Sequence, residues 1–478
     1  MAYQTVIGLE VHVQLSTASK MFCGCQVVFG APPNSLTCPV CLGLPGSLPV
    51  LNGRAVELGI RTALALGCRI HPESQFHRKN YYYPDLPKNF QISQYEYKDH
   101  PPLATGGALA VPSGDGPVRV GIRRVHLEED TGKLVHAPGR SLVDYNRSGT
   151  PLMEVVTEPD FHSAEEARVF LIQLRAVLQY AEVSTGRLEE GTFRCDANLS
   201  LRPPGGPHGI RTEIKNMNSL RSVERALRFE EARQRQVLER GEPVVQETRH
   251  WDEDREITFT SREKEEAQDY RYFPEPDLVP IQVDPAWIER VRADLPELPE
   301  ARRRRYVEVF GLPEHDAALV TASRAMAEFF ERTVEQYPKP KIVSNWLTGD
   351  IAAYLNATGR EVDEIPLRPA ALAGLLGLVD AGRVSGRSAK EVVEEMLRTG
   401  RTADAIVEER GLVQISDQEM LSAIVRDVIA EHPGPVADVR AGKEKAVAFL
   451  VGQVMKRTQG RANPAMVNRL ISEQLHAG

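Results

Sequence analysis

The spacing of apolar residues changes near residue 290, and this change limits the fold of the chain more than any other feature. Before that point, segments with the two-residue alternation of strands are mixed with a few helical segments and many Pro/Gly turns. Beyond it, the apolar spacing is almost entirely helical. We therefore expect an α+β chain, in which a mixed α/β domain precedes an all-α region.

The length of 478 residues suits about three domains. The change in spacing puts the first boundary between residues 280 and 300, and we take the N-terminal domain as residues 1–291. A second joint falls at "RTGRTADAIVEERG". We expect a helical middle domain at residues 292–405 and a small helical tail domain at residues 406–478.

Three helices are predicted within the N-terminal domain. Ser163 and Glu166 have the spacing of a capping box, so a helix should begin there. A second helix is expected from about Ser219 to Gly241, and a third, shorter helix should be closed by Gly67.

The chain has no stretch of about 18 apolar residues, and its N-terminus "MAYQTVIGLE" lacks the basic and apolar regions of a signal peptide. These features predict a cytoplasmic protein that does not enter a membrane. The net charge of −8 gives no general attraction to a polyanion, but residues 440–478 hold seven Lys or Arg against two Glu, a local net charge of +5. The tail thus offers a basic surface for phosphate backbones, with a solvated helix face as the alternative.

Four of the six cysteines lie between residues 23 and 41. Cys23 and Cys25 are separated by one residue, Cys38 and Cys41 by two, and the twelve residues between the pairs include the turn "APPNS". In a reducing compartment such a cluster favours metal binding over disulfides. Four thiolates leave no open coordination position, so a structural zinc ion fits better than a catalytic one. A redox pair and four unrelated thiols remain the alternatives.

Acidic residues recur in segments that alternate like strands. In "VIGLEVHVQL" the alternation places Glu10 and His12 on one face. The segment "VHLEEDTGKLVH" carries three consecutive acids from Glu128 onward, and Glu154 lies inside the apolar segment "LMEVV". A buried carboxylate is costly unless it is paired or binds a metal. An oxygen-rich set with one imidazole favours Mg²⁺. For Glu10 and His12 alone, an ordinary surface pair is the alternative.

The sequence shows no motif for hydrolysis. The Gly-Lys pairs that begin at Gly132 and Gly442 lack the Ser or Thr of a Walker A motif. There is no G-x-S-x-G elbow, no Gly/Ser-rich amidase loop, and residue 2 is alanine instead of a nucleophile. Any nucleotide site must therefore be of another type, and the chain lacks a hydrolytic centre of its own.

Several long motifs follow one another along the chain: "VIGLEVHVQL", "FCGC…CPVC", "HRKNYYYPDLPKNFQISQY", "HLEEDTGK", "VDYNRSGTPLMEVVTEPD", "RTEIKNMNS", "QETRHWDED" and "DYRYFPEPDL". Together they resemble the B subunit of glutamyl-tRNA(Gln)/aspartyl-tRNA(Asn) amidotransferase. The tail "LVGQVMKRTQGRANPAMVNRL" is similar to the C-terminal tRNA-binding module of that family. The resemblance therefore covers nearly the whole chain.

The resemblance implies a cradle-like catalytic domain with an antiparallel sheet, within a heterotrimer. The amidase, or A, subunit would release ammonia from glutamine, and the small C subunit would brace the assembly. The B subunit would use ATP to phosphorylate the side-chain carboxylate of misacylated Glu-tRNA(Gln) or Asp-tRNA(Asn) and would then amidate it, as a carbon–nitrogen ligase. The implied cofactors are ATP, Mg²⁺ and structural Zn²⁺, and an aminoacyl-tRNA synthetase is a further candidate partner.

The resemblance also assigns candidate residues by motif. The candidate catalytic residues and Mg²⁺ ligands are Glu10, His12, Glu128 and Glu154. The candidates for phosphate contacts or the ammonia path are Lys79, Lys88, Asp196 and Asn198. The candidate zinc ligands are Cys23, Cys25, Cys38 and Cys41. The candidate tRNA contacts are Lys443, Lys445, Lys456, Arg457 and Arg461.

Two other functions stay open. A noncatalytic, zinc-stabilised scaffold subunit that binds tRNA would use the acids only for folding. A metal-dependent hydrolase would act as an isolated chain, without ATP or partners.

Overall fold

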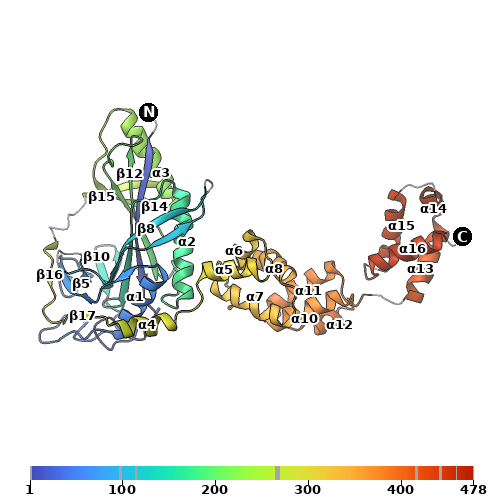
Figure 1. Cartoon of the computed structure of the whole chain (residues 1–478), viewed down its shortest axis with the longest axis horizontal. Helices are drawn as coiled ribbons and strands as arrows, with labels where there is room; N and C mark the ends of the chain where they lie inside the picture. Colours follow the sequence, from blue (N-terminus) through green and yellow to red (C-terminus); the bar gives the residue numbers. More distant parts are fainter. Residues whose placement is uncertain are drawn as a thin grey trace. The chain divides into compact units, whose positions relative to one another are not determined.

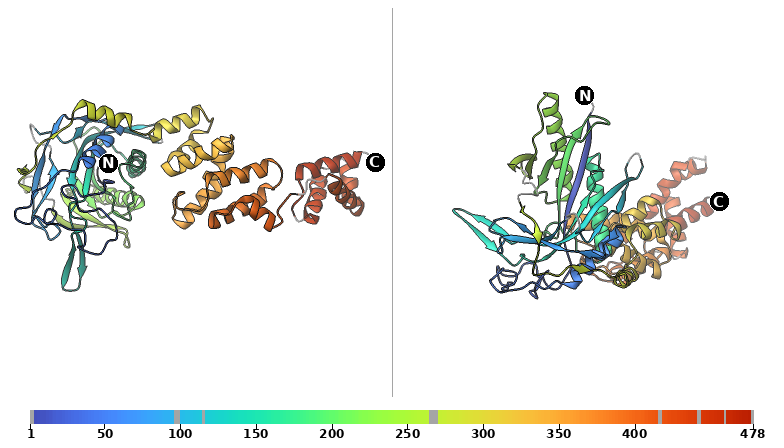
Figure 2. Two further views of the ribbon diagram at one scale, coloured as in Figure 1. Left: turned by 90° about the horizontal axis from the view of Figure 1, so that it is seen from below. Right: turned by 60° about the vertical axis from the view of Figure 1, so that its left-hand side comes forward.

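The computed structural model describes residues 3–95, 100–113, 116–263, 270–414, 418–440, 444–458 and 460–476. It forms two compact units, Met1–Pro299 and Glu300–Gly478. Strands occur in the first unit, and every described element after residue 300 is a helix (Figures 1 and 2). The predicted α+β fold with a helical C-terminal region is confirmed.

A 13-stranded sheet forms the centre of the N-terminal unit. Its strands are β1 (Gln4–Gln14), β2 (Arg69–Ile70), β4 (Phe76–Asn80), β5 (Phe90–Gln94), β6 (Ala104–Thr105), β7 (Ala108–Val111), β8 (Val118–Glu129), β11 (Pro151–Thr157), β12 (Phe193–Arg202), β13 (Thr212–Lys215), β14 (Glu247–Asp252), β15 (Ile257–Glu263) and β16 (Phe273–Pro274). Two small pairs join β9 (Lys133–Ala137) to β10 (Arg140–Asp144), and β3 (Glu73–Ser74) to β17 (Ile281–Gln282).

The main path of the sheet runs β15-β14-β13-β12-β1-β11-β8-β5-β4-β16, and β2, β6 and β7 branch from it. All of its strand pairs are antiparallel except β13 with β14. The first strand of the chain, β1, therefore lies in the middle of the sheet, between β11 and β12. Its central position brings its two neighbours, which are more than 130 residues away in sequence, against the "LEVH" segment.

Helices pack against this sheet: α1 (Gly53–Ala65) on β8, α2 (Ala164–Tyr180) on β7 and α3 (Leu220–Glu239) on β12, while α4 (Pro285–Ala293) contacts α1. The core holds alternate residues of β1, such as Leu9 and Val11, with Phe170 and Leu174 of α2. Because side chains alternate along a strand, this packing leaves Glu10 and His12 on the other face. Because one face of β1 is buried in the core, the opposite face carries its polar side chains.

The predicted helix starts are confirmed at their capping residues. The Ser163 hydroxyl accepts a hydrogen bond from the backbone N–H of Glu166, and the Glu166 carboxylate accepts one from the N–H of His162. Ser219 caps α3 in the same manner, and α1 ends just before Gly67 in the left-handed region.

The second unit is helical throughout its described residues. Its helices are α5 (Pro299–Glu308), α6 (Glu314–Thr321), α7 (Arg324–Gln336), α8 (Pro340–Trp346), the π-helical turn η2 (Leu347–Ile351), α9 (Ala352–Thr358), α10 (Pro369–Asp380), α11 (Gly386–Thr399), α12 (Ala403–Glu409), α13 (Gln418–Glu431), α14 (Pro433–Arg440), α15 (Glu444–Arg457) and α16 (Pro464–His476). The last four share a core that includes Leu421, Leu450 and Leu470. The expected boundaries at residues 291 and 405 fall within α4 and α12, and the three-domain division stays a proposal.

Among the described residues, no helix combines the length and the apolar character that crossing a membrane requires.

Candidate active site and metal centres

One face of the sheet carries a row of charged side chains across four neighbouring strands. His12 on β1 is directly opposite Glu154 of β11 on one side and Arg194 of β12 on the other. On the next strand, His126 of β8 is opposite Glu154. Residues directly opposite each other in an antiparallel pair share a face. These four side chains therefore form one row.

Three side chains converge along this row. Glu128 shares the face of His126 because it lies two residues further along β8. His12 Nε2 lies 3.7 Å from Glu128 Oε1 and 3.9 Å from Glu154 Oε2. One ligand atom from each of His12, Glu128 and Glu154 lies within 4.8 Å of the others. We call these three residues the acid cluster. Two buried carboxylates and an imidazole at this separation fit one divalent cation such as Mg²⁺.

Two imidazoles control the charge of the acid cluster. Burial alone would raise the pKa of the Glu154 carboxyl, but His126 and His12 outweigh burial and hold that pKa well below its usual range. For Glu128, the same two imidazoles lower the pKa against the effect of burial. Both carboxylates are therefore ionised at neutral pH, as ligands of a cation must be.

Glu10 lies on the same face but outside this converging group. Its Oε1 accepts a hydrogen bond of 2.9 Å from Asn198 Nδ2, and it is directly opposite Asp196. Burial first, and then the neighbouring carboxylates, raise the pKa of Glu10. The predicted residues Asp196 and Asn198 thus lie next to the predicted Glu10.

Two charged residues of β13 extend this face, and the sequence interpretation missed them. Lys215 Nζ lies 2.7 Å from Asp196 Oδ2 and 3.5 Å from Glu213 Oε1. Burial lowers the pKa of Lys215, but Asp196 and Glu213 outweigh burial and raise it overall. The alternation of "TEIK" could have placed Glu213 and Lys215 on one face, but nothing local shows that β13 lies next to β12.

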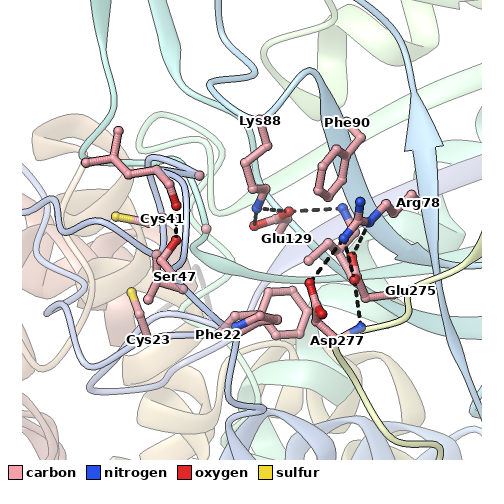
Figure 3. Close-up of a pocket in the computed structure, with 16 residues that line it drawn as sticks. Phe22, Cys23, Cys41, Ser47, Arg78, Lys88, Phe90, Glu129, Glu275 and Asp277 are labelled. Atoms are coloured by element: carbon pink, nitrogen blue, oxygen red, sulfur yellow. Dashed lines mark hydrogen bonds and ion pairs between the residues drawn. The ribbon is translucent and has the colours of Figure 1, made fainter.

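Lys88 occupies a pocket of about 190 Å³, where its ammonium forms an ion pair with Glu129 (Figure 3). Glu128 and Glu129 are consecutive on β8, so their side chains leave the strand on opposite faces. Arg78 binds Glu275 in the same pocket, with Nε at 2.8 Å from Oε2. Lys88 therefore does not face the acid cluster directly.

Lys79 is the second lysine expected to contact phosphate or ammonia. Its Nζ lies 4.8 Å from the ring centroid of Tyr270. On β4 it is directly opposite Gln91 of β5. This position is separate from the ion pair of Lys88.

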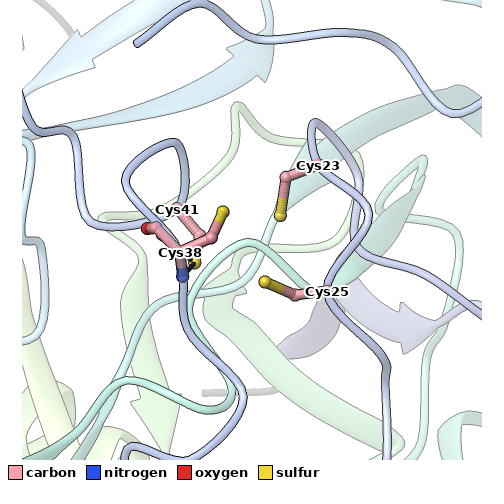
Figure 4. A group of neighbouring side chains, drawn as sticks. All are labelled: Cys23, Cys25, Cys38 and Cys41. Atoms are coloured by element: carbon pink, nitrogen blue, oxygen red, sulfur yellow. Dashed lines mark hydrogen bonds between the residues drawn. The ribbon is translucent and has the colours of Figure 1, made fainter.

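The four predicted zinc ligands come together from two loops (Figure 4). One sulfur atom from each lies within 4.8 Å of the others. A hydrogen bond from Cys23 is the largest influence on Cys41 and, with the Cys38 N–H and the charge of Lys20, lowers the pKa of Cys41 to about 4. Lys20 is fully buried, and its Nζ lies 3.6 Å from Cys41 Sγ. Four converging sulfurs with a buried ammonium beside them fit Zn²⁺ bound by thiolates.

The loop that carries the cysteines is tied to the segment just before β11. The Asn34 side chain accepts a hydrogen bond from Tyr145 N, and the Asp144 carboxylate accepts one from Asn34 N. Lys20 Nζ also donates to the Tyr145 carbonyl at 3.3 Å. This segment leads into β11, the strand that carries Glu154, so the cysteine loop is connected to that strand through it.

A cleft of about 530 Å³ opens beside Glu10. Its charged and polar lining combines three arginines with two carboxylates and further polar side chains: Arg123, Arg124, Arg211, Glu10, Glu158, Asn198 and His208. We call it the arginine cleft. A hollow with three arginines beside carboxylates suits a polyphosphate and its metal ion. Of these residues the sequence interpretation named only Glu10 and Asn198; it missed the three arginines and His208, which come from β8 and from the segment between β12 and β13.

The predicted tRNA contacts lie in the last helices. Lys456 and Arg457 are exposed in the last turn of α15, and Arg457 also binds Glu431 at 2.7 Å. Arg461 follows this helix and is half-buried. Lys443 and the side chain of Lys445 lie outside the described residues.

The fold and the site define a protein of the GatB/GatE catalytic class: residues 5–289 match the GatB/GatE catalytic domain, and residues 328–475 match the GatB domain. Among curated proteins, the B subunit of an aspartyl/glutamyl-tRNA(Asn/Gln) amidotransferase from Moorella thermoacetica is 57% identical over 99% of this chain and 100% of its own length. The B subunits of the same name from Carboxydothermus hydrogenoformans and Caldanaerobacter subterraneus are 52% and 53% identical over 99% of this chain, and over 99% and 100% of their own lengths. The chain belongs to this family of amidotransferase B subunits.

Proposed function

We propose that this chain is the ATP-dependent subunit of a heterotrimeric tRNA amidotransferase. It would convert Glu-tRNA(Gln), Asp-tRNA(Asn) or both into the amidated forms, with ammonia from the amidase A subunit and with the small C subunit in the assembly. The names of the relatives support the reaction and the presence of further subunits. The observation that carries the proposal is the acid cluster on the polar face of the sheet.

The reaction needs activation because ammonia does not displace oxide or hydroxide from a carboxylate. A side-chain carboxylate oxygen of the aminoacyl-tRNA attacks the γ-phosphorus of ATP, and ADP leaves. Ammonia then attacks the carbonyl carbon of the acyl phosphate, the carbon–oxygen bond to phosphate breaks, and the nitrogen loses a proton. Inorganic phosphate and the side-chain amide are the products.

The residues of the polar face suit these two steps. His12, Glu128 and Glu154 would hold Mg²⁺, which supplies positive charge against the repulsion between the carboxylate and the phosphates. The arginine cleft would bind the phosphates of ATP next to this position. Its place beside Glu10 and its charge support this role.

The remaining predicted residues keep supporting roles in the proposal. Asp196 and Asn198 would line a polar passage for ammonia, since both lie next to Glu10 on the polar face. Lys79 and Lys88 remain candidates for contacts to phosphate or ammonia. The four cysteines would bind a structural zinc ion, and the basic residues of the tail would contact the tRNA backbone.

A pair of isosteric changes tests the acid cluster. In a reconstituted heterotrimer, Glu154→Gln or Glu128→Gln should abolish ATP-dependent amidation, because each change removes a charged ligand from the cation site. The glutaminase activity of the partner and the binding of tRNA should persist. Glu165→Gln on the exposed side of α2 is the matched control and should leave amidation unchanged.

Full amidation by both cluster variants would refute the catalytic role. That result is what a noncatalytic scaffold subunit predicts. Activity of the isolated chain without ATP or partners would instead favour a metal-dependent hydrolase.

A further inference from the structure

His126 is a buried residue beside the acid cluster to which the sequence analysis assigned no role. It lies on β8 directly opposite Glu154 and is only 4% exposed. Its Nε2 lies 3.0 Å from Glu154 Oε2 and 3.8 Å from Glu128 Oε2. The shorter distance is that of a hydrogen bond between an imidazole N–H and a carboxylate oxygen.

The second ring nitrogen of His126 makes no such contact within the described part of the chain. His126 Nδ1 is buried and has no hydrogen-bond partner among the described residues. The contact with Glu154 is therefore the short polar contact that orients the ring. Burying an imidazole with one nitrogen unsatisfied costs free energy, so the presence of such a group beside the acid cluster calls for an explanation.

The same carboxylate oxygen lies between two imidazoles. Glu154 Oε2 is 3.0 Å from His126 and 3.9 Å from His12. The shorter contact fixes the carboxylate from the side of β8, and the longer one leaves space between His12 and Glu154. The converging ligand atoms come from His12, Glu128 and Glu154, and His126 is not one of this group. His126 therefore contacts the candidate ligand Glu154 but does not itself belong to the group whose ligand atoms converge.

We propose that His126 is a positioning residue of the acid cluster: its Nε2–H donates a hydrogen bond to Glu154 and sets the orientation in which that carboxylate meets a divalent cation. The inference rests on the proposed function, because it takes the acid cluster as the cation site. Partners that orient a metal ligand typically change metal affinity by about 10- to 100-fold when they are removed. His126 would act through Glu154, without contact to the substrate.

A matched pair of substitutions tests the hydrogen bond. His126→Gln can place an N–H donor near the position of Nε2, whereas His126→Met has a similar volume and no donor. Mn²⁺ serves as the probe, and its dissociation constant is measured by electron paramagnetic resonance on the reconstituted complex. We expect the Met variant to bind Mn²⁺ about 10- to 100-fold more weakly, and the Gln variant to bind within about threefold of the original chain.

Three results would overturn the inference. Original Mn²⁺ affinity in the Met variant would show that the hydrogen bond is not needed. If a folded His126→Gln variant binds Mn²⁺ as weakly as the Met variant, the N–H donor does not explain the loss of affinity. A nitrogen coupling to Mn²⁺ that persists when His12 is replaced by Gln would show that His126 itself is a ligand. Thermal unfolding shows whether the Met variant is folded. If it is not, the Mn²⁺ affinity of the Gln variant and the nitrogen coupling to Mn²⁺ decide whether His126 is a positioning residue.

The outcome is distinguishable from a failure of the proposed function. Glu154→Gln and Glu128→Gln should lose Mn²⁺ binding whatever His126 does. If these two variants bind Mn²⁺ normally, the proposed cation site is wrong. If they lose binding and His126→Met keeps it, only the positioning role fails.

Discussion

Lys20 gives a quantitative prediction about the cysteine site. Its ammonium is fully buried 3.6 Å from Cys41 Sγ, next to four sulfur atoms that we expect to bind Zn²⁺ as thiolates. Zinc with four thiolates carries a net charge of about −2. Lys20→Met keeps most of the side-chain volume and removes the compensating charge. We therefore expect the variant to hold zinc less tightly.

The magnitude follows from the distance. Unit charges about 4 Å apart attract by about 4 kcal/mol at an effective dielectric constant of ~20. Here the negative charge is spread over four sulfurs, and the ammonium has lost its hydration. The net effect should be nearer the ~1.5–3 kcal/mol of a hydrogen bond to a charged group. Zinc affinity should therefore fall by about 10- to 150-fold.

Zinc transfer to a coloured chelator measures this change. Lys133→Met, on the exposed start of β9, is the matched control and should release zinc like the original chain. Lys20→Met should release it faster and should leave less zinc bound at a fixed chelator concentration. Unchanged release from a folded Lys20→Met variant would refute the charge argument, and absence of zinc from the original chain would refute the zinc site.

Two further predictions concern acid stability and the tail. Burial alone would raise the pKa of Glu247, but hydrogen bonds from Thr260 and Arg249 outweigh burial and lower the pKa below its ordinary value of 4.5. Its stabilisation is therefore complete above about pH 4.5 and is lost as the pH falls through the lower folded value. Glu247→Gln should reduce the free energy of unfolding by about 1–3 kcal/mol at pH 7, with a smaller difference at pH 3, and urea unfolding at both values measures it. An equal difference at both values would contradict this assignment. In the tail, Lys456→Gln together with Arg457→Gln should weaken tRNA binding and reduce the slope of log affinity against log salt by about 1 for each phosphate that is no longer bound. An unchanged slope in binding assays at several salt concentrations would show that these two residues do not contact phosphate.

Local patterns were sufficient where neighbouring residues decide the structure. The capping box at Ser163 predicted the start of α2, because a cap needs only its own first turn. Alternation predicted that Glu10 and His12 share a face, and the apolar run "LMEVV" predicted the buried strand around Glu154. The spacing of the four cysteines likewise indicated their convergence, because a turn of twelve residues can bring the pairs together.

His126 shows what the alternation of side chains along a strand could not predict. The parity of "VHLEE" already places His126 and Glu128 on one face of a strand. It does not show which strand lies next to them, so the contact with Glu154 could not be expected from the sequence. The same parity places Glu128 and Glu129 on opposite faces, which is why Lys88 binds Glu129 in a separate pocket.

The sequence by itself determined the α+β division, the helix starts, the polar face of β1 and the residue types of two candidate metal sites. The tertiary structure decided the strand order β8-β11-β1-β12 and the register that aligns His126, Glu154, His12 and Arg194 in one row. The physical reason is the separation along the sequence over which each interaction acts. Caps and alternation arise from sterics and hydrogen bonds within a few residues, whereas strand order depends on burying one face of the whole sheet between segments more than 100 residues apart.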